Sequence, residues 1–136
     1  MNTETIFGIP FIVICLAAVA LPVAYQRLKY LLLPSSFAEF SLIRRATGLN
    51  IHHAHWGLLF ILSTGVWNSL FARNEWTTLI FFLGLGLLLD EIIPHLRMPG
   101  TDRALELTIY EKAARPSIIL VAIVIIAIVA LFYVAR

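Results

Sequence analysis

Two short segments of this chain hold side chains suited to binding a metal ion. The first opens a long apolar run with three of the four histidines, and the second closes another apolar run with two neighbouring carboxylates and the fourth histidine. These candidate residues are His52, His53, His55, Asp90, Glu91 and His95. Imidazole and carboxylate groups in combination are ligands for Zn, Fe and Mn. The two segments therefore predict a mixed metal site, provided that the fold brings them together.

The composition identifies the solvent in which these residues lie. Hydrophobic residues make up 60% of the 136 residues and charged residues only 13%, which is far from the balance of a soluble domain. The apolar runs are continuous rather than alternating, so they predict membrane-spanning helices and not barrel strands. We therefore expect an all-α polytopic membrane protein, a single transmembrane domain over residues 1–136, with the lipid bilayer as its first partner.

The charged residues and the single cysteine exclude several other classes. The net charge is only +2, and the cations lie at the ends of apolar runs, where Lys and Arg anchor a helix at the membrane interface. This distribution argues against a nucleic-acid partner. Cys15 lies inside the first apolar run and is the only cysteine, which excludes an intramolecular disulfide and any cysteine-based zinc or cluster motif.

Four apolar runs predict four transmembrane helices, at residues 6–25, 51–71, 76–93 and 117–134. Each is close to the roughly 20 residues that a helix needs to cross a ~30 Å hydrocarbon core. Pro22 is expected to kink or end the first helix, because proline in a helix interior removes a hydrogen bond. Residues 101–115 predict a short helix along the membrane surface, and a second interfacial piece is expected within residues 26–50.

The distribution of Lys and Arg predicts the orientation. Eight of the ten cations fall in the connections after the first and third apolar runs, and the other two fall on the opposite side. Because loops rich in Lys and Arg stay in the cytoplasm, both long connections are expected to be cytoplasmic and both termini outside.

A short turn between the second and third runs brings the two candidate segments to one depth. The turn is centred on residues 73–74, and His55 precedes it by about as many residues as Asp90 follows it. A helix rises about 1.5 Å per residue, so these two side chains lie within roughly 3 Å of the same level. The other candidate residues are expected at about the same depth in the membrane, on the cytoplasmic side.

Angular spacing then selects among the candidates. At about 100° per residue, His52 and His55 share one face of their helix, whereas His53 points away from both. Glu91 and the histidine four residues after it share a face of the next helix. The predicted ligands are therefore His52, His55 and Glu91, with His95 or Asp90 completing the set.

A site of this kind predicts metal-dependent chemistry at the cytoplasmic side. Three protein ligands with an open position are a catalytic arrangement, in which the metal acidifies a bound water. Asp90 is the candidate general base if it is not a ligand, and His53 would orient a ligand through a hydrogen bond. The leading hypothesis is a membrane metal-binding protein that acts as a small metal-dependent enzyme on a lipid or amphiphilic substrate.

A different class of function fits the same histidines. Two imidazoles from different helices can hold haem b, so His52 or His55 together with His95 could form an electron-transfer site. The histidines could also be purely structural in a homo-oligomer or a subunit of a larger membrane complex. Two carboxylates at a helix C-terminus oppose the helix dipole, however, and this favours a compensating cation, metal or proton.

The two segments together resemble a sequence pattern seen elsewhere. Residues 51–57 read Ile-His-His-x-His-x-Gly, and residues 84–91 read Gly-x-Gly-Leu-x-Leu-Asp-Glu. This pairing of an HHxHxG helix start with a GxGLxLDE helix end is similar to that of a broad set of small, uncharacterised prokaryotic integral membrane proteins. The resemblance covers residues 51–91 and implies that the two segments belong together, but it implies no reaction.

Better-known membrane metalloenzymes resemble the chain less well. Desaturases and hydroxylases of membranes also cluster histidines, but their boxes need more than the four histidines present. Zinc-dependent ceramidases and adiponectin-receptor-like proteins use a similar set of ligands on seven helices. The chain contains no HExxH, GxSxG or P-loop motif, which argues against a metallopeptidase, a serine hydrolase and an NTPase.

Overall fold

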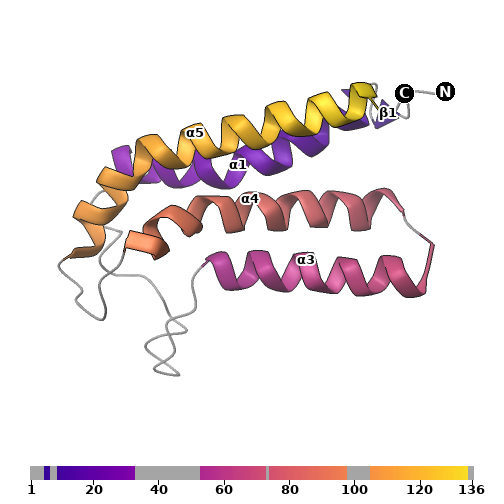
Figure 1. Ribbon diagram of the computed structural model, residues 1–136, viewed down its shortest axis with the longest axis horizontal. Helices are drawn as coiled ribbons and strands as arrows, with labels where there is room; N and C mark the ends of the chain where they lie inside the picture. The colour runs from indigo at the N-terminus through magenta and orange to yellow at the C-terminus, as the bar shows by residue number, and fades with distance from the viewer. Residues whose placement is uncertain (1–4, 7–8, 33–52, 73, 98–104, 135–136) are drawn as a thin grey trace.

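Four α-helices make up most of the described chain. The computed structural model describes residues 5–6, 9–32, 53–72, 74–97 and 105–134. The helices are α1 (Phe11–Leu32), α3 (His53–Leu70), α4 (Glu75–Arg97) and α5 (Leu105–Val134), and a small antiparallel pair of strands, β1 (Thr5–Ile6) and β2 (Ile9–Pro10), precedes them (Figure 1). The predicted all-α class is confirmed.

Helix α4 lies in the middle of the bundle. It packs against α3 on one side and against α1 and α5 on the other (Figure 1). Helix α1 begins, and α5 ends, at the same end of the bundle as the tight turn between α3 and α4 (Figure 1). At the opposite end α1 and α4 end and α3 and α5 begin, so residues from all four helices gather there (Figure 1).

Three of the described helices are long and apolar enough to cross a membrane. The spans are Phe11–Lys29, Glu75–Pro94 and Lys112–Val134. Helix α3 is not among them, because its 18 residues include His53, His55 and Asn68. These spans agree with the expected membrane location.

Pro22 does not end the first helix. Helix α1 continues through it to Leu32 instead of ending near Tyr25. Proline removes the backbone donor that would bond the Ala18 carbonyl, and this carbonyl lies against Gly86 of α4, where an added Cβ would be 2.9 Å away. The close approach of a neighbouring helix thus covers the carbonyl that the proline leaves unbonded.

The other two internal prolines are also accommodated within helices. Helix α4 runs through Pro94, which is buried, to Arg97. The predicted span at residues 117–134 and most of the predicted surface helix at 101–115 belong to one helix, α5, with Pro116 inside it; residues 101–104 lie outside the described chain.

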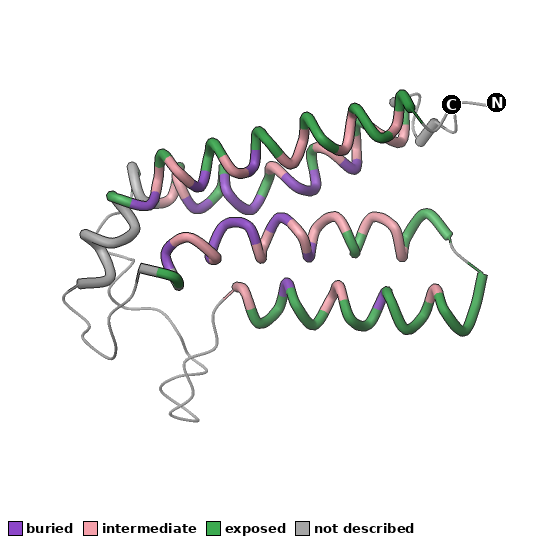
Figure 2. The backbone as a smooth tube through the Cα atoms, viewed as in Figure 1, coloured by how far each residue is buried: buried purple, intermediate pink, exposed green. Residues whose placement is uncertain are grey.

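The hydrophobic core lies between α1, α4 and α5. Its buried residues are Val19, Val23, Leu89 and Val121. Helix α3 contributes little to this core, since its only buried residues are Gly57 and Thr64, and its outer side is exposed along its length (Figure 2). That outer side is rich in exposed leucine, valine and tryptophan, which suits contact with lipid.

Glycines allow α4 to touch two neighbours at the level of the backbone. A Cβ on Gly57 would lie 2.6 Å from the carbonyl oxygen of Gly84, and a Cβ on Gly86 would lie 2.5 Å from that of Val19. Gly84 therefore faces α3 and Gly86 faces α1. Gly65 is different, because nothing lies within 4 Å of the Cβ that it lacks.

Candidate metal centre

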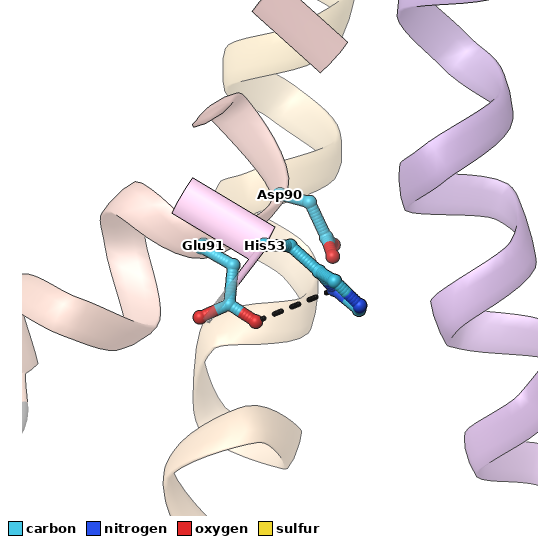
Figure 3. Close-up of side chains that lie close together, drawn as sticks. All are labelled: His53, Asp90 and Glu91. Atoms are coloured by element: carbon cyan, nitrogen blue, oxygen red, sulfur yellow. Dashed lines mark ion pairs between the residues drawn. The ribbon is translucent and has the colours of Figure 1, made fainter. Parts of the chain in front are cut away.

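Three side chains come together at the end of the bundle where α3 begins. His53, Asp90 and Glu91 can each offer one ligand atom, and these atoms all lie within 4.8 Å of one another. Figure 3 shows the three side chains directed into the same space, with the Glu91 carboxylate 3.7 Å from Nδ1 of His53. Asp90 is fully buried and Glu91 is 3% exposed.

The glycines explain why these side chains meet. His53 lies one turn before Gly57 on α3, and Glu91 lies two turns after Gly84 on α4, so each side chain shares a face with the glycine at the helix contact. The close backbone contact therefore holds the two helices together near the imidazole and the carboxylate. Asp90 shares a face with Gly86 in the same way and is directed toward α1.

Helix α1 supplies two further polar residues to the site. The guanidinium Nη2 of Arg27 lies 3.8 Å from Oδ1 of Asp90, and the side-chain amide of Gln26 contacts the ring of His53. Both residues fall in a predicted connection, because the first apolar run ends at residue 25. The signal that could have found them is the helical spacing from Val19 and Val23, which continues to Gln26 and Arg27.

Several oxygen atoms are buried at the site. Both carboxylate oxygens of Asp90 and Oε1 of Gln26 are buried without a hydrogen-bond partner among the described residues. Leaving a buried polar group without such a partner costs about 1 to 3 kcal/mol, and more when the group is charged. A cation or ordered water in this space would satisfy several of these oxygens at once.

The donor set has the chemistry of a divalent metal site. One imidazole and two carboxylates are a combination that binds Zn, Fe and Mn, with bonds of about 2.0 to 2.2 Å for zinc. Ligands of one ion lie about 3 to 4 Å apart at such bond lengths. Atoms that now lie within 4.8 Å of one another therefore need only small side-chain movements to close on an ion.

The structure brings together some of the predicted residues and separates others. Asp90 and Glu91 lie together with His53, the histidine expected to orient a ligand, whereas His55 is exposed on α3 and does not belong to this group. His52 and the side chain of His95 lie outside the described residues, so their predicted ligation stays a prediction. The described residues give no support to haem b, since they place one histidine at the site and surround it with carboxylates.

Comparison with known proteins identifies no relative of this chain. No family model, no curated protein and no solved structure matches the chain. The resemblance to membrane proteins that carry both motifs stays a prediction.

Proposed function

We propose that this chain is an integral membrane metal-binding protein that holds a divalent Zn, Fe or Mn ion with His53, Asp90 and Glu91. The observation that carries the proposal is a half-buried imidazole and two buried carboxylates whose ligand atoms lie within 4.8 Å of one another. Ionisable residues inside a membrane-spanning helix are rare and usually functional. The Asp90 oxygens, which have no hydrogen-bond partner among the described residues, add support.

A purely structural ion-pair network explains the site less well. The Arg27 guanidinium at 3.8 Å from Asp90 contributes about 4 kcal/mol at an effective dielectric of about 20. Burying a single ion costs several kcal/mol, and two carboxylates are buried side by side. One guanidinium at that distance offsets the burial of one of them, and a bound cation or a proton at the site would stabilise the pair further.

The chemistry that suits this centre is metal-assisted hydrolysis. Three protein ligands leave positions open for water, whose proton a metal ion makes easier to remove. Asp90 serves as the general base if the ion takes only the other two ligands. Because the helices that carry the site expose apolar surface along their length, the substrate class is a lipid or another amphiphile that approaches through the membrane.

We propose also that α3 crosses the membrane, giving four spans with both termini outside and both long connections in the cytoplasm. Helix α3 lies alongside α4 (Figure 1), so a bilayer that surrounds α4 surrounds α3 as well. Its 18 residues measure about 27 Å, close to the ~30 Å hydrocarbon core.

This topology has a direct test. A reporter that works only outside the cytoplasm, such as alkaline phosphatase fused after Arg136, is expected to be active, and a fluorescent reporter that folds only in the cytoplasm is expected to be dark. An odd number of spans would place the two chain ends on opposite sides. A fluorescent C-terminal fusion would therefore contradict the proposed orientation.

The proposed function is tested by metal analysis of purified protein in detergent. The wild-type chain is expected to retain Zn, Fe or Mn in a one-to-one ratio after dialysis, and the Asp90→Asn/Glu91→Gln variant is expected to lose it, because both anionic ligands are gone. Glu75→Gln is the matched control, since Glu75 is an exposed carboxylate at the other end of the same helix. Wild-type protein that takes up none of these ions would refute the proposal, and a Soret band would favour haem instead.

A further inference from the structure

The side chain of Gln26 closes the candidate metal centre from α1. It is only 6% exposed, and its Nε2 lies 2.5 Å from Nδ1 and 3.2 Å from Nε2 of His53. Its Oε1 is buried without a hydrogen-bond partner among the described residues. The amide therefore uses its nitrogen at the site, while the oxygen, which is the atom able to bind a metal, is left without a partner.

The hydrogen bond from Gln26 and a metal ion would both use the lone pair of a ring nitrogen of His53. An amide N–H group donates only to a ring nitrogen that carries no proton, and a ring nitrogen that binds an ion has no lone pair left to accept it. With an ion on Nδ1 of His53, the amide would direct its hydrogens at a cation. The amide must therefore change its orientation when an ion binds.

A half turn of the amide removes this conflict. It exchanges Nε2 with Oε1, two atoms of nearly equal size, so the rest of the packing is unchanged. The oxygen then occupies the present position of the nitrogen, 2.5 and 3.2 Å from the two ring nitrogens of His53. Two ligands of one octahedral ion, each about 2.1 Å from it, lie about 3 Å apart.

We propose that Gln26 turns its amide oxygen to the ion and is a fourth protein ligand, supplied by α1. This inference rests on the proposed metal site of His53, Asp90 and Glu91. The donor set then has three oxygens and one nitrogen, a balance that suits Mn more than a set rich in imidazole would. It also makes the site a joint product of three helices, because α1, α3 and α4 each contribute a ligand.

Two substitutions at this position separate a ligand from a mere hydrogen-bond donor. Gln26→Leu removes the amide at nearly constant size and is expected to weaken Mn²⁺ and Zn²⁺ binding by at least about 10-fold, since even groups that only support a metal ligand cost about 10- to 100-fold when removed. Gln26→Glu keeps an oxygen in place and adds a charge, so it is expected to bind both ions at least as tightly as the wild type. Affinities are measured by competition with a chelating dye, and free Mn²⁺ is followed by its paramagnetic resonance signal.

The controls distinguish the failure of this inference from the failure of the metal site. Asn68→Leu removes a partly buried amide near the opposite end of the bundle and is expected to leave both affinities unchanged. Unfolding temperatures of all variants show whether the fold is intact. If Gln26→Leu binds as tightly as the wild type, or more tightly, the amide acts only as a donor to His53 and the inference is wrong. If the wild type binds neither ion, the metal site itself is wrong, and the inference falls with it.

Discussion

Replacing His53 by alanine is expected to lower the affinity for the bound ion by more than about 100-fold, whereas His55→Ala changes it by less than about 2-fold. Groups that only orient a metal ligand cost about 10- to 100-fold when removed, and His53 is proposed to be a ligand itself. Its Nδ1 lies 3.7 Å from Glu91, while His55 is exposed on α3 outside this group. Competition with a chelating dye measures both affinities.

This pair of variants also tests the ligand set that angular spacing favours. Both substitutions remove one imidazole from the same turn of α3, so their effects on helix propensity are matched. Unfolding temperatures close to that of the wild type would show that neither variant unfolds the bundle. Loss of the ion from His55→Ala with retention in His53→Ala would overturn the arrangement proposed from the structure.

The glycine contact between α3 and α4 is expected to be equally sensitive to substitution. In Gly57→Ala the new Cβ would lie 2.6 Å from the carbonyl oxygen of Gly84 and 2.7 Å from the backbone nitrogen of Leu88. Backbone atoms cannot move aside as a flexible side chain can, so the helices must separate. Overpacking of this kind costs about 1 to 3 kcal/mol. We expect a lower unfolding temperature together with weaker metal binding, because His53 moves away from Glu91.

Gly65→Ala on the same helix is the matched control for this prediction. Nothing lies within 4 Å of the position that its Cβ would take. Alanine is favoured over glycine in a helix interior by about 0.5 to 1 kcal/mol, so the control is expected to raise stability slightly or leave it unchanged. Equal unfolding temperatures for Gly57→Ala and Gly65→Ala would show that the close contact does not hold these helices together.

The depth of the candidate site could be predicted from the sequence because it depends on little more than counting. The turn between α3 and α4 is short and both segments are helical, so the rise per residue returns Asp90 and Glu91 to the level of the histidines. The structure indeed places His53 beside these carboxylates.

The face that α3 presents to α4 could not be predicted by angular spacing alone. Spacing says which residues share a face, and it does not say which face meets the neighbour. That direction is set by Gly57 and Gly84, because a helix contact this close is possible only where both sides lack a side chain. His53 lies one turn before Gly57 and shares its face of α3. The position of the glycine therefore indicates which histidine meets α4, and the histidine cluster by itself does not.

The residues that α1 contributes to the site could not be predicted from the sequence for a different reason. The rule that proline ends a helix holds for a helix without close neighbours, and α1 passes Pro22 because Gly86 lets α4 cover the carbonyl that loses its donor. A local rule was thus overridden by a tertiary contact, and the residues beyond the proline, Gln26 and Arg27, entered the site.

The Arg27–Asp90 pair has a consequence for the order in which the protein is assembled. Small zinc domains unfold without their metal, because metal binding supplies much of their folding free energy. Here a permanent cation of the chain lies beside one of the carboxylates before any ion arrives. We therefore expect insertion into the bilayer and folding to come first and metal loading second, so that ions can exchange with the surrounding solution while the four helices remain in place.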